Sequence, residues 1–426
     1  MKKYWFYLEP HVYVEFKTEK ILVYCTKTGA HLEIEELHCR SIIENIYKDE
    51  NLGVVEISED QAMNTNLQGM IDYLTTHGMG NLVPVVDPDE KPVILLPLLS
   101  LNKDLDRMKD EEMREMIAGT DICKYLLGVT IIVNNECHLK CRHCGLSCNQ
   151  FMCCQSDKDA VKELDRELLV SVLSQLSYMP TKTINIIGGD VYKFCHLDVF
   201  SKITEKKILN VWTNYKNYQP DSTIDQCRIH LLVDFPFDKN KFAAVTKETK
   251  GKDTTYHFIV DNEEQLEDSL SNVSHFRIAN YKIHPYYNGA NVDFFDKKVF
   301  MDKDDIFSSI HSMREILRNK KLNANYFGEL YIFPDGEVRA ERNTEALGNI
   351  KEADIKTMIQ RELIENTAWR KTRMHTPCSE CICQNLCPSP IYYEIVTNKK
   401  CCGRKMDSDE SLLSNLNNNN YEKKFN

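Results

Sequence analysis

Hydrophobic and polar positions alternate in the first part of the chain. Apolar residues recur at every second position in segments 12–16, 21–25 and 31–34, and Thr28-Gly29 stands before the last of them. A period of two is typical of strands with one buried face, and threonine-glycine is a turn signal. We therefore predict a small antiparallel sheet in this region.

The apolar spacing then changes to that of helices. In segment 39–47 apolar residues recur at i, i+3, i+4, i+7 and i+8, and a second stripe of this kind runs through 63–74. A short apolar strand is expected at 54–57, after which Ser58 and Gln61 form a capping box. The pattern thus predicts three strands followed by helices.

A change of composition follows this unit. Residues 87–118 carry prolines and then a run of alternating charge, which is typical of a linker and a connecting helix rather than of a new core. We place a domain boundary here, with an amino-terminal unit at 1–86 and a linker with a connecting helix at 87–122.

From residue 123 onward, strand patterns and helix patterns follow one another. A helix with an apolar stripe at 168–176 separates the first two strands. Repeated strand-helix-strand units predict a parallel sheet, open or curled into a partial barrel. We expect an α/β fold, a partial (β/α)6 TIM-like barrel, over 123–325. The predicted strands are 127–134, 183–187, 208–213, 228–233, 256–260 and 276–279.

This alternation ends near residue 326. Two short apolar segments flank Pro334-Asp335-Gly336, whose turn residues predict a hairpin. A cysteine-rich stretch follows, and an asparagine run at 417–420 begins a segment that we expect to be disordered. We assign a small third domain to 326–408 and the tail to 409–426.

Charge and hydropathy exclude two classes of partner. The 426 residues carry 53 basic and 64 acidic side chains, a formal net charge of −11, and no basic stretch that would attract a phosphate backbone. No signal peptide is evident, and the strongest apolar run, 93–101, falls short of the roughly 20 residues that cross a bilayer. We expect a cytoplasmic protein with neither a nucleic acid nor a membrane as partner.

Most of the 17 cysteines fall into two groups. In a reducing cytoplasm such groups are more commonly metal-binding or catalytic than disulfide-bonded. The remaining cysteines are expected to be small buried apolar residues. The first group is Cys137, Cys141, Cys144, Cys148, Cys153 and Cys154, and the second is Cys378, Cys381, Cys383, Cys387, Cys401 and Cys402. Spacing assigns no role to the last three members of the first group.

Cys137, Cys141 and Cys144 follow the first predicted barrel strand. Loops at the carboxyl ends of such strands carry active sites. Three thiolates on a tight loop can bind three irons of a 4Fe-4S cluster and leave the fourth iron open. A zinc site or ordinary buried cysteines are the alternatives, but structural zinc sites commonly use four ligands with paired C-x2-C spacing. We therefore expect an open 4Fe-4S cluster.

The spacing C-x3-C-x2-C resembles the cluster motif of the radical S-adenosylmethionine (SAM) superfamily. That resemblance implies that the open iron binds SAM, that an electron from the cluster cleaves SAM, and that a 5'-deoxyadenosyl radical then removes hydrogen from the substrate. His143 stands where the family usually has an aromatic residue near the adenine.

Further residues at strand ends carry the same resemblance. Gly188-Gly189-Asp190 is similar to the family's Gly-Gly-Glu segment, which contacts the SAM amino group. Glycines let a backbone approach a ligand, and a carboxylate accepts a hydrogen bond from an ammonium. The family often places SAM-ribose contacts at the next two strand ends, although turn or capping roles are the alternative there. The corresponding residues are Thr213, Asn214 and Asp234.

The second cysteine group resembles the SPASM domain, the auxiliary-cluster module of peptide-modifying radical SAM enzymes. Cys378-x2-Cys381-x5-Cys387 carries the resemblance, and Cys401 or Cys402 is available as a fourth ligand. It implies one auxiliary 4Fe-4S cluster. Zinc on the same four thiolates is the alternative.

That module usually holds two clusters, and this chain departs from it at two positions. Just after the predicted hairpin, where the family has a cysteine, the chain has Ala340-Glu341-Arg342. Four residues beyond Cys387, where another cysteine is expected, it has Ile391. We therefore expect that the other auxiliary cluster is missing.

The amino-terminal unit resembles the winged-helix leader-recognition domain of maturases for ribosomally made peptides. Such domains bind a leader peptide as an added strand at a sheet edge. The basis of the resemblance is the order of strands and helices, and a structural cap on the barrel is the alternative.

Together these resemblances imply a maturase of ribosomal peptide natural products, of the Bacteroidetes type. The implied substrate is a precursor peptide with a leader, and the implied partner is an external reductant such as flavodoxin or ferredoxin. A thioether or carbon-carbon crosslink is the expected product, and epimerisation is the second choice. The alternatives are a protein-maturing enzyme of the sulfatase-maturase type and a non-catalytic scaffold that binds the leader. The sequence names no catalytic acid or base.

Overall fold

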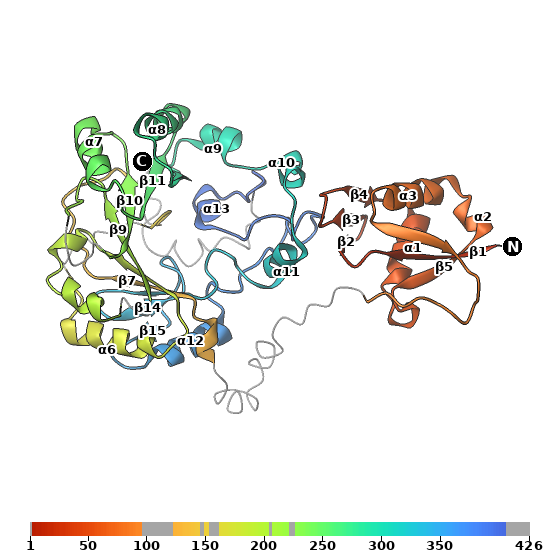
Figure 1. Ribbon diagram of the computed structural model, residues 1–426, viewed down its shortest axis with the longest axis horizontal. Coiled ribbons are helices and arrows are strands. Elements are labelled where there is room, and N and C mark those ends of the chain that lie inside the picture. The colour runs from red at the N-terminus through yellow and green to blue at the C-terminus, as the bar shows by residue number, and fades with distance from the viewer. Residues whose placement is uncertain are drawn as a thin grey trace.

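The computed structural model describes residues 2–95, 122–144, 149–152, 162–203, 207–220 and 226–405. Within these ranges the chain is a mixed α/β structure with one large sheet and two small ones. Figure 1 shows the amino-terminal elements beside a larger body that holds the rest. None of the described helices is both long enough and apolar enough to span a membrane. Residues 96–121 of the expected linker, the tail 409–426 and Cys148, Cys153 and Cys154 lie outside the described residues.

Two three-stranded antiparallel sheets form the amino-terminal unit. The three predicted strands are present and pair in the order β2-β3-β4. The second sheet, β5-β1-β6, contains the predicted strand β5 and two strands that the pattern does not predict. Because β1 pairs with β5 and β6, which both lie far along the chain, its strand structure depends on nonlocal pairing. The bounds are β1 (Lys3–Leu8), β2 (Val12–Phe16), β3 (Ile21–Cys25), β4 (His31–Ile34), β5 (Val54–Ser58) and β6 (Gly80–Pro84).

Helices pack on these sheets through the predicted apolar stripes, in a core that contains Ile43 and Leu74. The predicted capping box is present: Ser58 N donates to Gln61 Oε1 at 3.0 Å, and Gln61 N donates to Ser58 Oγ at 3.2 Å. It begins the one-turn helix α2, whereas the longer helix α3 has its own cap at Asn64. The bounds are α1 (Leu37–Ile46), η1 (Asp49–Asn51), α2 (Glu59–Ala62) and α3 (Thr65–Thr76).

A nine-stranded sheet, in the order β12-β11-β10-β9-β8-β7-β13-β14-β15, forms the centre of the larger body. Strands β7 to β12 are parallel to one another, and β13 of the predicted hairpin adds to β7, also in parallel. Strands β7 to β11 and the hairpin strands β13 and β14 lie where the sequence predicts them. The bounds are β7 (Gly128–Ile132), β8 (Thr183–Ile187), β9 (Ile208–Asn214), β10 (Arg228–Val233), β11 (Thr254–Val260), β12 (Tyr281–Pro285), β13 (Glu329–Ile332), β14 (Glu337–Arg339) and β15 (Gly348–Asn349).

The sixth parallel strand is not where the pattern predicts it. A strand is expected at 276–279, but Phe276 ends helix α8 (Glu263–Phe276), and strand β12 begins at Tyr281. The apolar residues in the expected segment instead anchor the end of α8 in the core. Strand β12 does alternate, with Tyr281 and Ile283 against Lys282 and His284, but the alternation is short and ends at Pro285, so the signal is weak.

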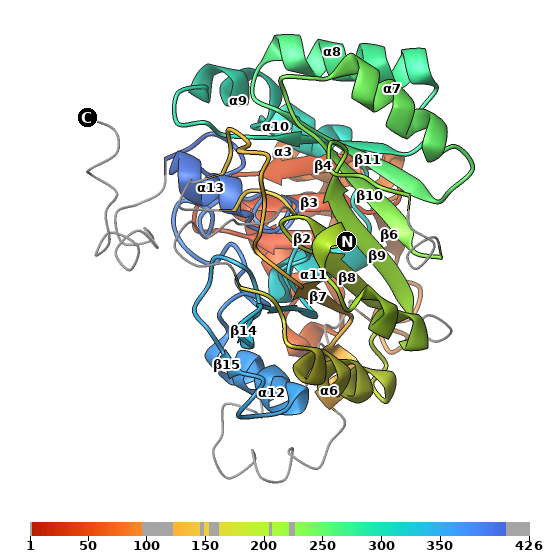
Figure 2. The ribbon, with the colours of Figure 1, turned by 90° about the vertical axis from the view of Figure 1, so that its left-hand side faces the viewer.

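The two faces of the large sheet differ in chemistry. Helices α6 (Arg166–Ser177), α7 (Lys239–Glu248) and α8 cover the face that carries apolar residues such as Ile186 and Leu231. Figure 2 shows α7 and α8 beside the strands. Because successive side chains of a strand alternate between faces, the intervening residues lie on the opposite face, which we call the inner face. It carries Thr130, Asn185, Asn210, Trp212, His230, His257 and His284.

The carboxyl-terminal segment joins the two parts of the molecule. Tyr13, Leu22 and Tyr24 of the amino-terminal sheet share one core with Ile306, Ile316 and the cysteine-rich stretch. In Figure 1 strands β2 to β4 accordingly lie next to helices α10 and α11. The remaining elements are η2 (Ile122–Tyr125), η3 (Val191–Lys193), η4 (Leu197–Ile203), α9 (Val292–Lys298), α10 (Lys303–Ser308), α11 (Met313–Lys321), α12 (Ile355–Glu365) and α13 (Tyr392–Thr397).

Candidate active site

The first cysteine loop leaves the sheet at the carboxyl end of β7. Asn134 ties this loop to the end of β8, since its Nδ2 donates to the carbonyl oxygen of Asp190 at 3.0 Å and its Oδ1 accepts from Gly189 N at 2.8 Å. The Asn134 side chain is buried, so these bonds satisfy an amide that would otherwise be costly to bury. These two hydrogen bonds hold the start of the segment that leads to Cys137 against the end of β8.

Gly188 and Gly189 lie directly against that segment. A Cβ atom added to Gly189 would be 2.0 Å from the carbonyl oxygen of Glu136 and 2.8 Å from Cys137 N, and one on Gly188 would be 2.6 Å from Asn134 Oδ1. Only glycine fits at either position without a shift of the loop. The sequence predicts that these glycines let the backbone approach a ligand; in this structure they let it approach the cysteine loop.

Asp190 continues this segment and is mostly buried. Its carboxylate caps η3 and accepts a hydrogen bond from Tyr192 N at 3.2 Å. Burial raises the pKa of this carboxyl above its usual value, and the charge of Lys193 partly opposes that rise. Asp190 therefore acts as the cap of η3, and its carboxylate lies beside the loop that begins at Cys137.

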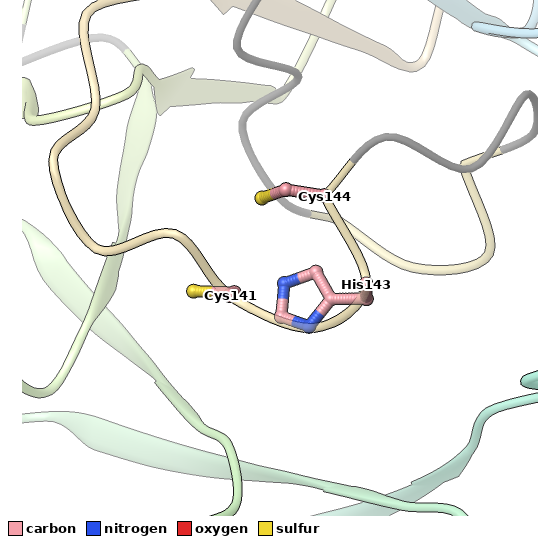
Figure 3. Close-up of side chains that lie close together, drawn as sticks. All are labelled: Cys141, His143 and Cys144. Atoms are coloured by element: carbon pink, nitrogen blue, oxygen red, sulfur yellow. The ribbon is translucent and has the colours of Figure 1, made fainter.

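Cys141, His143 and Cys144 come together on one turn of the loop, as Figure 3 shows. One ligand atom from each lies within 4.8 Å of those of the other two. The turn is closed by a hydrogen bond from Cys144 N to the Cys141 carbonyl oxygen at 3.0 Å. Cys137 is on the same loop but does not belong to this group. Soft sulfur donors of this kind suit an iron-sulfur cluster, and two thiolates with an imidazole also suit zinc.

His143 and its neighbour Arg142 contact different parts of the barrel. The His143 ring meets Phe151 and Tyr286 edge-on, with ring centroids 4.7 Å and 6.0 Å away. Arg142 forms an ion pair with Asp261, which follows β11, with Arg142 Nη2 3.6 Å from Asp261 Oδ2. Asp261 is not among the predicted site residues, although it directly follows β11 just as Asp234 directly follows β10.

At the ends of β9 and β10 the structure brings two predicted site residues together. Asn214 Nδ2 donates to Asp234 Oδ1 at 2.9 Å, and Lys216 Nζ lies 3.2 Å from the same carboxylate. Thr213 is paired with Leu231, whose side chain belongs to the helix-covered core, so strand alternation directs Thr213 away from the inner face. Asn214 and Asp234 are thus available as polar groups at the strand ends, and Thr213 is not adjacent to them on that face.

Below the strand ends, hydrogen-bonding side chains cross the inner face. Asn185 Nδ2 donates to Thr130 Oγ1 at 3.1 Å. Its Oδ1 accepts from Asn210 Nδ2 at 2.9 Å and from Trp212 Nε1 at 3.2 Å. The Trp212 ring stacks on His230 at 4.2 Å, with 11° between the ring planes. This row links β7, β8, β9 and β10.

Three histidines continue the row across β10, β11 and β12. His230 Nδ1 and His257 Nε2 are 2.9 Å apart, and His257 Nδ1 and His284 Nε2 are 2.8 Å apart. Burial lowers the pKa of His230 and of His284 to about 4 and that of His257 to about 2. All three imidazoles are therefore neutral at pH 7, and the central ring, His257, donates at one nitrogen and accepts at the other. Their spacing of 27 residues was not recognised from the sequence, and it places one histidine on each successive strand.

The second cysteine group is buried near the amino-terminal sheet. Burial raises the pKa of Cys378, and contact with Cys387 together with burial raises the pKa of Cys401. Cys401 thus lies beside Cys387 and is the more buried of the two candidate fourth ligands. Among the described residues, however, Cys378, Cys381 and Cys387 do not form a group as compact as the one at Cys141.

A buried ion pair supports this second group. Arg373 donates to Glu394 through Nη1 at 2.9 Å and through Nη2 at 2.7 Å, and its Nη1 also lies 3.8 Å from the Cys378 sulfur. Hydrogen bonds with Glu394 raise the pKa of Arg373 against the effect of burial. The guanidinium therefore stays charged next to Cys378, where it would favour a thiolate.

Comparisons with known proteins give the following matches. No protein-family model and no curated protein matches the chain. Among solved structures, the chain is similar to Streptococcus suis SuiB bound to S-adenosylmethionine, with 11% identity over 94% of this chain and 99% of that chain and a TM-score of 0.45. Native anSMEcpe with bound AdoMet matches with 14% identity over 61% and 88% of the two chains and a TM-score of 0.43. HydG, a maturase of the [FeFe]-hydrogenase, matches with 17% identity over 48% and 52% and a TM-score of 0.28.

Proposed function

We propose that this protein is a radical SAM enzyme that modifies a peptide. The observation that carries the proposal is the motif Cys137-x3-Cys141-x2-Cys144 on the loop after β7, which comes first in the chain among the parallel strands, with Cys141 and Cys144 on one turn. Carboxyl ends of parallel strands are the usual place of an active site. Three thiolates are the ligand set that leaves one iron of a 4Fe-4S cluster open.

In this proposal the cysteine loop holds the cluster, and polar groups at the neighbouring strand ends hold SAM. The chemistry that the bound pair supplies is reductive cleavage of SAM to a 5'-deoxyadenosyl radical. Asp190, Asn214 and Asp234 offer carboxylate and amide oxygens for the amino and hydroxyl groups of SAM. Phe151 and Tyr286, which contact His143, exclude water beside the turn.

A peptide is the proposed substrate because of the amino-terminal unit. This unit holds two small antiparallel sheets, and we propose that it acts as the leader-recognition domain, because a sheet edge can take up an added strand. The shared core with the cysteine-rich stretch holds this unit on the same side of the molecule as α10 and α11. We propose a crosslink, thioether or carbon-carbon, as the product, with electrons from a flavodoxin- or ferredoxin-type partner.

An anaerobic assay tests the radical step. The full chain is reconstituted with iron and sulfide, reduced, and given SAM, and 5'-deoxyadenosine is measured. We expect product from the wild type and from Cys195→Ala, which removes an exposed cysteine outside both groups, and none from Cys141→Ala. If iron-loaded, reduced protein forms no 5'-deoxyadenosine, the enzyme proposal fails and the leader-binding scaffold is favoured.

A second measurement tests the SPASM-like auxiliary cluster that we propose on Cys378, Cys381, Cys387 and Cys401. Iron and sulfide are determined for the wild type and for the double variant Cys378→Ala/Cys381→Ala. We expect the double variant to lose about half of the iron, as two equal clusters require. Full retention of iron would remove the auxiliary cluster, and zinc in place of the lost iron would identify a structural zinc site.

A further inference from the structure

A buried guanidinium lies beside the proposed site without a matching partner. Arg342 is 5% exposed. Its Nη1 donates to the Phe151 carbonyl oxygen over a long distance of 3.4 Å. In the part of the chain that the structure describes, its Nε and Nη2 have no hydrogen-bond partner. Two donors of a permanently charged group are thus buried and unused.

Such an arrangement is costly, and another equally buried arginine of the chain avoids it. A charge removed from water needs a counter-charge or full hydrogen bonding. Arg373, which is equally buried, has both: two hydrogen bonds to Glu394 and one from Nε to the Pro388 carbonyl oxygen at 2.7 Å. The contrast indicates that Arg342 is not an ordinary structural arginine.

The carboxylate that precedes Arg342 in the chain, that of Glu341, is already hydrogen-bonded to another residue. Glu341 accepts from Asn343 N and Asn343 Nδ2, each at 2.8 Å, so its oxygens face Asn343. Burial raises the pKa of Glu341, and the nearby charge of Arg342 partly opposes that rise, but among the described residues no carboxylate forms an ion pair with this guanidinium.

The position of Arg342 connects it to the cysteine loop. The Phe151 ring stands 4.7 Å from His143 and packs with Trp212 and Tyr286 on the inner face. Asn149 and Asn343 also exchange hydrogen bonds of 2.8 Å and 3.0 Å, which tie the segment that follows the cysteine loop to the loop that holds Arg342. The guanidinium therefore lies beside the backbone of Phe151, whose side chain packs on the inner face next to His143.

We propose that Arg342 binds a carboxylate of a molecule that enters this site. A guanidinium with two adjacent free donors matches a carboxylate in a bidentate arrangement, which neither an amide nor an alcohol reproduces. Nε and Nη2 are such an adjacent pair. The identity of the carboxylate rests on the proposed function: it belongs either to SAM or to an acidic residue of the substrate peptide.

The first test needs neither a cluster nor a known substrate. The full chain is prepared with 15N-arginine, and the Arg342 Nε signal is assigned from its absence in Arg342→Lys. Sodium acetate is titrated, with acetamide and sodium chloride as neutral and ionic controls. We expect the Arg342 signal to shift with acetate alone. The proposal is overturned if acetate moves this signal no more than chloride or acetamide does.

The second test separates the two sources of the carboxylate. Affinities for SAM and for decarboxylated SAM are measured on reconstituted protein by calorimetry. If SAM supplies the carboxylate, Arg342→Met weakens SAM binding about tenfold or more and leaves decarboxylated SAM unaffected. If the peptide supplies it, SAM binding is the same in wild type and variant while the acetate response persists.

A control arginine is available at the opposite end of the sheet. Arg228 begins β10, and its Nε pairs with Asp253 Oδ2 at 2.9 Å on the surface. Arg228→Met is therefore expected to leave the acetate response and both affinities unchanged. A failure of the radical assay together with a positive acetate response would reject the proposed function and keep the carboxylate site.

Discussion

At the scale of single residues, the contact between Gly189 and the cysteine loop leads to a prediction. Gly189→Ala places a methyl group 2.0 Å from the Glu136 carbonyl oxygen, so the loop that carries Cys137 has to move. We expect a loss of stability of about 1–3 kcal/mol, typical of overpacking, and reduced iron uptake. Chemical denaturation and iron analysis measure the two effects.

Gly69→Ala is the control for this substitution. Gly69 lies in helix α3, and an added Cβ meets nothing within 4 Å. The change should stabilise the protein by about 0.5–1 kcal/mol, because alanine favours the helix, and should leave iron uptake unchanged. Equal iron uptake by Gly189→Ala and wild type would show that the loop tolerates the shift.

The buried pair Arg373–Glu394 gives a second prediction at this scale. Glu394→Gln keeps the shape of the side chain and removes the charge that compensates Arg373. Breaking a buried pair from one side costs about 3–5 kcal/mol, because the remaining charge stays buried. The double variant Arg373→Met/Glu394→Leu should cost less than the single one. Urea denaturation measures the free energy of unfolding of both variants. A larger loss of stability in the double variant than in Glu394→Gln would contradict this explanation.

At the scale of elements, the histidine row on β10, β11 and β12 predicts how stability depends on pH. All three folded-state pKa values lie below the ordinary value of 6.5, so the unfolded chain binds more protons in acid. The stabilisation is complete above pH 6.5 and is lost as the pH falls toward 4. Each histidine contributes a slope of up to about 1.4 kcal/mol per pH unit in this window.

Replacement of the central histidine checks this assignment. His257→Gln keeps a donor and an acceptor on the side chain but cannot take up a proton. The free energy of unfolding of this variant should therefore fall less steeply between pH 6.5 and 4 than that of the wild type. Urea denaturation at several pH values measures the slope, and equal slopes would mean that another group causes the acid sensitivity.

The same strands show how far the sequence predicts the fold. Strands β7 to β11 are predictable because their apolar residues pack under helices and follow one another closely along the chain. Strand β12 is not predictable, because its alternation is short and ends at Pro285. Strand β1 is not predictable, because both of its partner strands are distant in the chain.

The candidate site likewise has features that the sequence predicts and contacts that it does not. The cysteine spacing is visible in the sequence because all of its members lie on one loop. The contacts of Arg142 with Asp261 and of Arg342 with Phe151 join segments more than 100 residues apart, and no local pattern marks them. Such pairs become visible only when the sheet has brought the strand ends together.

At the scale of the whole molecule, the contact between the amino-terminal unit and the cysteine-rich stretch is the main long-range link. Asn385 Nδ2 donates to Tyr13 OH at 3.0 Å and to Glu15 Oε2 at 2.8 Å, and all three residues are buried. Tyr13 OH also donates to Glu15. If a peptide docks on the amino-terminal unit, this link determines whether the docked chain is held at a fixed position relative to the cysteine loop.

Asn385→Ala tests the link. The substitution leaves Tyr13 and Glu15 buried with one donor fewer, which should cost about 1–3 kcal/mol and loosen the interface. We expect faster hydrogen exchange in β2 and β3, where the interface residues lie, and unchanged exchange in β8 and β9. Asn51→Ala is the control, because it removes a hydrogen bond to the Asn45 carbonyl oxygen within the amino-terminal unit. If Asn385→Ala changes exchange in β2 and β3 no more than Asn51→Ala does, the apolar core that Leu22 and Tyr24 share with Ile316 is sufficient to hold the two parts together.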